Sequence, residues 1–315
     1  MISLAILWLT HSMLAFMPQP QGASGVSILC SGWNYQAAGT KWDIIGYAAN
    51  GGAPIALVNS AESEISPFPF PNEPAFGYLV ERRETVYLYK YDMATGKSSD
   101  LGISLKRGVT CRVSPDGKRL ACSDMIDGRY QIVVYDLATK QREQITSYPT
   151  FSFDPSWSPD GKKLVYWIES GKKTTVGNEL MAESDHLAIY DFESKTHVLL
   201  TNRPGVPDQY PRWSPDGKWI AFSRMGKQSW NIWVVRPDKS EEIQITTGAR
   251  EDSFPDWSPD SRTILFQSYR SGDGSYLDIY SVDVAAKTVT QVTTTGRIDE
   301  QKPVFFSGQK NSHQE

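Results

Sequence analysis

Three acidic residues share a spacing that could serve chemistry, because Asp208, Asp252 and Glu300 each stand three positions before a proline. Ser152 and Gly108 take the corresponding place in two related segments, so the acidic set is incomplete. Carboxylates that meet in space can bind a partner's donors, hold a hard cation such as Ca²⁺, or accept hydrogen bonds from neighbouring backbone. The spacing alone leaves all three uses open.

Known catalytic motifs are absent from the sequence. It has no G-x-S-x-G, no P-loop and no G-x-G-x-x-G. The four histidines form no cluster, and a Ser–His–Asp arrangement needs a fold to bring its members together; they are His11, His186, His197 and His313. We therefore predict no catalytic residue, no metal site and no cofactor, and only a Ca²⁺ ion among the acidic residues is left open.

The cysteines Cys30, Cys111 and Cys122 show no metal-ligand spacing. Cys111 and Cys122 flank a tight turn and are therefore close to cross-strand neighbours. They either form a disulfide in an oxidising compartment or serve as small buried hydrophobic residues. The strand register decides between these alternatives, because a slip of one residue moves one cysteine to the other face of the sheet.

A Ser-Pro-Asp turn recurs four times, at spacings of 44, 56 and 44 residues; its serines are Ser114, Ser158, Ser214 and Ser258. Proline presets φ, aspartate accepts hydrogen bonds from nearby N–H groups, and glycine supplies a positive φ. The aspartates are therefore predicted to be structural; they are Asp116, Asp160, Asp216 and Asp260. Ser261 replaces the glycine of the fourth copy, so this turn is expected to be more strained.

Each repeat reads as four short strands, and units of about 40–50 residues with four strands are typical of propeller blades. Degenerate copies raise the number of blades to six. The segment 299–307 supplies the innermost strand that residues 26–58 lack. The sequence therefore predicts an all-β, six-bladed β-propeller of four-stranded antiparallel blades over 23–310, closed by the C-terminal strand joining the N-terminal blade.

The fold suggests where a partner would bind. The first strand of each propeller blade lines the central channel, so Asp208, Asp252 and Glu300 are expected at the channel mouth. Loops opening on the same face carry four further candidates, which are Arg224, Arg270, Tyr269 and Trp33. An acidic and aromatic rim with nearby arginines suits a protein or peptide partner. Packing within the blades is the alternative use of these side chains.

The repeats resemble a known family. The segment "DQYPRWSPDGKWIAFS" at 208–223 is similar to the TolB-type propeller repeat, which is also found in propellers of prolyl-oligopeptidase-like peptidases and of tricorn protease. TolB proper has a further N-terminal α/β domain, and the peptidases have a hydrolase domain, for which this sequence has no counterpart. The resemblance implies a TolB-like propeller, and TolB's own partner, a peptidoglycan-associated lipoprotein, suggests an envelope lipoprotein as the partner.

Composition and termini bear on location. The formal net charge is −4 and no basic stripe occurs, so a nucleic-acid partner is not expected. Residues 1–22 are predicted to be a signal peptide, which implies a periplasmic or secreted protein, and 311–315 form a tail. No other segment is apolar enough to span a membrane. We expect a monomer.

The leading functional prediction is a non-catalytic propeller of the cell envelope that binds a protein or peptide at its channel face. Two alternatives remain open. One is a hydrolase or lyase acting on a peptide or glycan held over the channel. The other is an accessory propeller that gates substrate for a separate peptidase.

Overall fold

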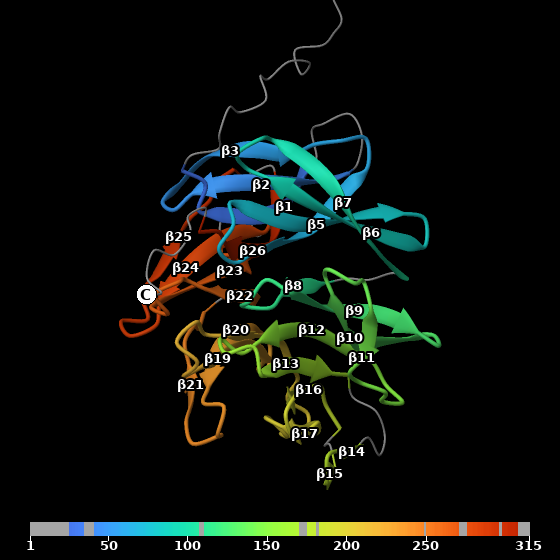
Figure 1. Ribbon diagram of the computed structural model, residues 1–315. Helices are drawn as coiled ribbons and strands as arrows, with labels where there is room; N and C mark the ends of the chain where they lie inside the picture. Colours follow the sequence, from blue (N-terminus) through green and yellow to red (C-terminus); the bar gives the residue numbers. More distant parts are fainter. Residues whose placement is uncertain are drawn as a thin grey trace, which may run out of the picture.

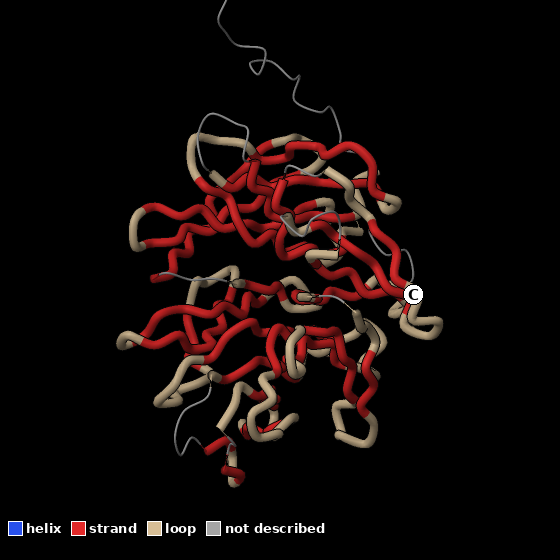
Figure 2. Tube along the Cα trace, turned by 180° about the vertical axis from the view of Figure 1, so that it is seen from behind, coloured by secondary structure: helices blue, strands red, loops and turns tan. Residues whose placement is uncertain are grey.

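The computed structural model describes residues 25–34, 41–106, 110–169, 175–180, 183–248, 250–270, 276–295 and 298–307. Over these residues the chain consists of strands and loops (Figure 2). The strands form six four-stranded antiparallel sheets, which follow one another around a ring in the order of the sequence (Figure 1). The six-bladed β-propeller predicted from the repeats is therefore confirmed.

The first three blades are built as follows. Blade 1 consists of β26 (Ile298–Phe305), β1 (Ile28–Asn34), β2 (Trp42–Ala48) and β3 (Gly51–Val58). Blade 2 consists of β4 (Ser63–Pro69), β5 (Ala75–Arg82), β6 (Thr85–Asp92) and β7 (Lys97–Lys106). Blade 3 consists of β8 (Cys111–Val113), β9 (Arg119–Ile126), β10 (Arg129–Asp136) and β11 (Arg142–Gln144).

The other three blades keep the same order of strands. Blade 4 consists of β12 (Ser152–Trp157), β13 (Lys163–Ile168), β16 (His186–Asp191) and β17 (Thr196–Leu199). Blade 5 consists of β18 (Asp208–Trp213), β19 (Ile220–Met225), β20 (Trp230–Val235) and β21 (Glu242–Gln244). Blade 6 consists of β22 (Asp252–Trp257), β23 (Thr263–Ser268), β24 (Asp278–Asp283) and β25 (Val289–Gln291).

The ring closes through its own ends, as predicted. Strand β26 pairs antiparallel with β1, with Leu29 opposite Val304, and the Phe306 N–H donates to the Ser27 carbonyl at 2.8 Å. Closure leaves no long open sheet edge at the junction between the first and last parts of the chain. The predicted signal peptide at 1–22 and the tail at 311–315 lie outside the described residues.

The repeated turn owes its shape to its side chains. In blade 5 the Ser214 hydroxyl donates to Asp216 at 2.7 Å and accepts from the Trp219 N–H at 2.9 Å, which joins both sides of the turn. Gly217 has φ +72°, and Ser261 adopts φ +59° at the corresponding place in blade 6. The left-handed conformation is the costly one for a residue with a Cβ, so Ser261 carries the strain expected of it.

A bulge marks most of the inner strands. The residue before the inner-strand proline has a positive φ, as at Asp154, Tyr210 and Phe254, and the pairing register shifts there. Because proline has no N–H to give to the sheet, the bulge lets the strand pass it and resume pairing in a shifted register.

Hydrophobic cores lie between neighbouring blades. One cluster joins Leu79 and Leu88 of blade 2 to Leu120 and Cys122 of blade 3. Five further clusters join the other pairs of neighbouring blades, so each blade packs through both faces. Between β13 and β16 the chain also forms a small hairpin of β14 (Thr175–Val176) and β15 (Glu179–Leu180). The part of the chain that the structure describes has no helix long and apolar enough to cross a bilayer.

Candidate functional site

The two ends of the channel differ in their chemistry. We call the end at which the inner strands begin the acidic end, since Asp208, Asp252 and Glu300 lie there. We call the end at which they finish the turn end, since the Ser-Pro-Asp turns follow there.

At the acidic end Asp208 is fully paired. Arg224, directly opposite it on β19, donates from Nε and Nη2 to its two carboxylate oxygens at 2.6 and 2.8 Å. Arg224 also forms an ion pair with Glu242. Asp208 and Arg224 are 0% and 3% exposed. The pair therefore fastens β18 to β19 with a bidentate, charge-assisted contact.

Asp252 is bound in the same way in blade 6. It accepts from the Arg270 Nε at 3.0 Å and from the Ser268 hydroxyl at 2.7 Å. Glu300 instead uses neutral partners, because the hydroxyls of Tyr47 and Thr293 donate to its two oxygens. Burial raises the pKa of Glu300 to about 7, since no cation offsets the loss of hydration.

The remaining predicted residues pack within their blades. Trp33 meets Trp42 edge to face with ring centroids 5.2 Å apart. Tyr269 lies under the guanidinium of Arg250 at 5.8 Å. The sequence analysis missed Glu64, which occupies the acidic position in blade 2, is 1% exposed and accepts from the Ser60 hydroxyl. Its Glu-x-x-Pro spacing is the signal that could have revealed it.

Among the described residues, no group of three or more His, Cys, Asp or Glu side chains is arranged to hold a metal ion. Cys111 and Cys122 lie opposite each other on β8 and β9 and form a disulfide, which settles the alternative that the sequence left open. Cys111 stands where the other inner strands have proline, and Cys30 is a buried thiol.

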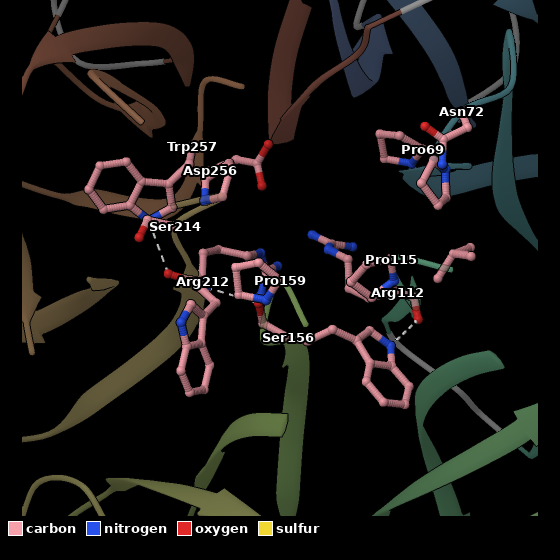
Figure 3. Close-up of a pocket in the computed structure, with 15 residues that line it drawn as sticks. Pro69, Asn72, Arg112, Pro115, Ser156, Pro159, Arg212, Ser214, Asp256 and Trp257 are labelled. Carbon is pink, nitrogen blue, oxygen red and sulfur yellow. Dashed lines mark hydrogen bonds between the residues drawn. The ribbon is translucent and has the colours of Figure 1, made fainter. Parts of the chain in front are cut away.

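The turn end holds a cavity of ≈ 590 Å³ (Figure 3). Five of the six blades contribute to its lining, through the ends of their inner strands and the turns that follow; among the lining residues are Pro69, Arg112, Ser156, Arg212, Asp256 and Trp257. This volume lies within the range of small-ligand sites in proteins, which is roughly 300–1,000 Å³.

Two arginines occupy the position after the inner-strand proline, or after Cys111, in blades 3 and 5. Arg112 donates from Nη1 to the Cys111 carbonyl at 2.8 Å, and Arg212 donates likewise to the Pro211 carbonyl at 2.8 Å. Neither arginine forms an ion pair of 4.0 Å or less with a carboxylate of the described residues. Their charge is thus uncompensated by direct contact.

Asp256 takes the same position in blade 6. One of its oxygens accepts from the Phe305 N–H at 2.8 Å. Figure 3 shows the Asp256 carboxylate and the Arg112 guanidinium turned toward the middle of the cavity from different sides. Burial raises the pKa of Asp256, while the charges of Arg112 and Arg212 oppose that rise.

The two arginines also act on each other. Burial, and next the charge of Arg212, lower the pKa of Arg112 to about 9. Like charges in a poorly hydrated space repel, so an anion between them would relieve both effects. Sequence reasoning overlooked these arginines because the position after the proline is occupied by unrelated residues in other blades, such as Phe68 and Ser156.

The architecture and the channel cavity define a six-bladed β-propeller closed through its own ends. Residues 178–311 match the family described as PD40, TolB beta propeller domain. The resemblance carried by the repeats is thereby confirmed over the part of the chain that this family model matches, and the propeller as a whole has the fold of the TolB propeller.

Individual relatives match over parts of their length. An uncharacterized protein of Agrobacterium fabrum is 28% identical over 206 residues, which cover 64% of this chain and 66% of the relative. Dipeptidyl-peptidase 5 of Porphyromonas gingivalis is 42% identical over 80 residues, which cover 24% of this chain and 11% of the peptidase. The crystal structure of TolB from Acinetobacter baumannii superimposes with a TM-score of 0.75 at 19% identity, covering 89% of this chain and 66% of TolB.

Proposed function

We propose that this propeller is a non-catalytic binding protein of the cell envelope that takes a protein or peptide segment at its central channel. The observation that carries the proposal is the ≈ 590 Å³ cavity at the turn end, where five blades bring together prolines, tryptophans and arginines. Aromatic residues and arginine are enriched in protein interfaces, and prolines give a rim that is already ordered before a partner binds.

Export to the envelope is supported by the Cys111–Cys122 disulfide, because such bonds persist in oxidising compartments and are rare in the cytosol. The likeness to TolB makes an envelope lipoprotein a reasonable class of partner. Cell fractionation followed by thiol labelling of the denatured protein tests the location. Recovery in the cytosolic fraction with three reactive cysteines would contradict export.

Binding at the cavity is tested by probing an array of short peptides with the purified protein. Pro159 lies on the cavity rim, so Pro159→Trp is expected to reduce binding at least tenfold by filling the opening. Lys162→Trp is the matched control, because Lys162 is exposed in the same turn and does not line the cavity. Equal binding by both variants would contradict the proposed site.

A separate incubation tests whether the protein is an enzyme. Mass spectrometry of peptides and oligosaccharides incubated with the purified protein is expected to find the substrates unchanged. Turnover would favour the hydrolase or lyase alternative instead.

Contacts between a partner and the acidic end remain a prediction. Since Asp208, Asp252 and Glu300 already accept hydrogen bonds within their blades, a partner there would have to compete with those bonds. A peptide that binds Asp208→Ala as well as it binds the wild type would rule out a role for that carboxylate.

A further inference from the structure

Arg212 at the turn end has more N–H donors than hydrogen-bond partners among the described residues. A guanidinium carries five N–H donors, and Arg212 is only 4% exposed. Its Nε is buried without a hydrogen-bond partner among the described residues. A buried donor left unpaired is costly, so this N–H is suited to an acceptor that arrives with a ligand.

The sign of the charge in the channel identifies the kind of acceptor. Arg112, Arg212 and Lys302 interact electrostatically with Asp154, and Asp256 faces both arginines. Lys302 also interacts with Glu81. Lys302 donates to the Ser66 hydroxyl at 2.9 Å, which leaves the arginines as the cations nearest the cavity. Because neither arginine has a carboxylate within 4.0 Å among the described residues, the acceptor best suited to them carries a negative charge.

The next blade fixes the backbone of each arginine. The indole N–H of Trp157 donates to the Arg112 carbonyl, and that of Trp257 donates to the Arg212 carbonyl, both at 3.0 Å. The same contact therefore occurs twice, each time joining a blade to its neighbour. Each guanidinium is itself hydrogen-bonded to the carbonyl of the preceding residue, so it loses less conformational freedom when a ligand binds.

We propose that Arg112 and Arg212 together bind a carboxylate of the partner peptide, while Asp256 accepts an N–H from the same segment. The inference rests on the proposed function and adds the chemistry of the ligand. Guanidinium groups match the planar carboxylate, and the partly enclosed cavity strengthens the contact relative to water. The carboxylate is either the C-terminus of the peptide or an Asp or Glu side chain.

Three capped dipeptides separate these sources. Acetyl-Ala-Phe has a free C-terminus, acetyl-Glu-Phe-amide has only a side-chain carboxylate, and acetyl-Gln-Phe-amide has neither. Each is titrated into the ¹⁵N-labelled full chain while the arginine Nε–H resonances are followed by NMR. We expect at least one carboxylate peptide to shift the Arg212 resonance and to bind at least tenfold more tightly than the uncharged peptide.

Substitutions complete the test. Arg112→Gln and Arg212→Gln should each weaken binding of the carboxylate peptide at least tenfold. Arg212→Lys should bind it more tightly than Arg212→Gln does, because lysine keeps the charge. Arg129→Gln, an exposed position in the same blade as Arg112, should have no effect. Circular dichroism establishes that every variant is folded.

The outcomes distinguish this inference from the function on which it rests. Peptides that bind at the cavity equally well with acid or amide groups would overturn the carboxylate and leave the binding function standing. If carboxylate dipeptides bind only when both arginines are present, but none of the longer peptides on the array binds, the carboxylate site stands and the proposed peptide-binding function is overturned. Inorganic phosphate binding more tightly than either carboxylate peptide would overturn the assignment of a peptide ligand.

Discussion

At the acidic end of the channel Arg224 donates to both oxygens of Asp208. At the turn end Arg212 donates to a backbone carbonyl and keeps a buried N–H that has no partner among the described residues. The same residue type thus completes an internal ion pair in one place and faces a cavity in the other. Removing one partner of a buried ion pair is strongly destabilising, and a buried charge without a partner is costly unless a ligand pairs with it.

The acidic end also illustrates how each inner strand is fastened. Asp208 ties β18 to β19 through Arg224, and Asp252 ties β22 to β23 through Ser268. In blade 3 the Cys111–Cys122 disulfide joins β8 to β9. Different chemistry therefore serves one purpose, which is to hold the innermost strand against its neighbour.

The largest expected effect tests the paired end. Arg224→Met keeps most of the side-chain length but leaves the Asp208 carboxylate, which is 0% exposed, without its cation. The free energy of unfolding should fall by about 3–5 kcal/mol, as for other broken buried pairs. Urea unfolding followed by tryptophan fluorescence measures this change.

Arg82→Met is the control, because the exposed pair of Arg82 and Glu62 should contribute at most about 1 kcal/mol. If both variants lose the same stability, burial does not determine how much the ion pair at the acidic end contributes to the free energy of unfolding.

The second effect concerns Glu300, whose pKa is raised to about 7 from an ordinary value of 4.5. The folded state favours the protonated acid, so this group's stabilisation is complete below pH 4.5 and is lost as the pH rises through 7. The loss amounts to about 3 kcal/mol at 1.36 kcal/mol per pH unit. Glu300→Gln, which mimics the protonated acid, should abolish it.

Thermal unfolding of the wild type and Glu300→Gln between pH 4 and pH 8 measures the difference. The two stability curves should separate with rising pH, with the variant the more stable at pH 8. Parallel curves would mean that Glu300 titrates at its ordinary pKa.

The third effect is the contribution of the disulfide in blade 3 to stability. Replacing both Cys111 and Cys122 by alanine removes a cross-link between residues 11 positions apart, and should lower the free energy of unfolding by about 2–3 kcal/mol. Reductant should destabilise the wild type by a similar amount and leave the double variant unaffected. A wild type insensitive to reductant in denaturation experiments would show that the bond does not constrain the unfolded chain.

Much of the fold could be read from the sequence because its signals are local and repeated. Pro, Asp and Gly specify the turn after each inner strand, and the terminal segments complement each other strand for strand. Pairing across strands is different in kind. Asp208 and Arg224 were both singled out, yet only the register of β18 against β19 makes them partners. The disulfide stayed open for the same reason.

The cavity was harder to foresee. Arg112 and Arg212 follow the proline position, which a repeat pattern leaves variable, and no local rule separates a channel-facing arginine there from one that packs between blades. Their importance comes from blades 3 and 5 facing one space, which is a property of the closed ring.

The smallest expected effect on stability is at the turn end. The double variant Arg112→Gln and Arg212→Gln removes two cations that repel each other and Lys302, and this relief offsets their lost attraction to Asp154 and Asp256. The free energy of unfolding should therefore change by no more than about 1 kcal/mol in either direction. Urea unfolding under the conditions used for Arg224→Met allows direct comparison. A loss as large as that of Arg224→Met would mean that these arginines hold the propeller together, and the contrast between the two ends would then disappear.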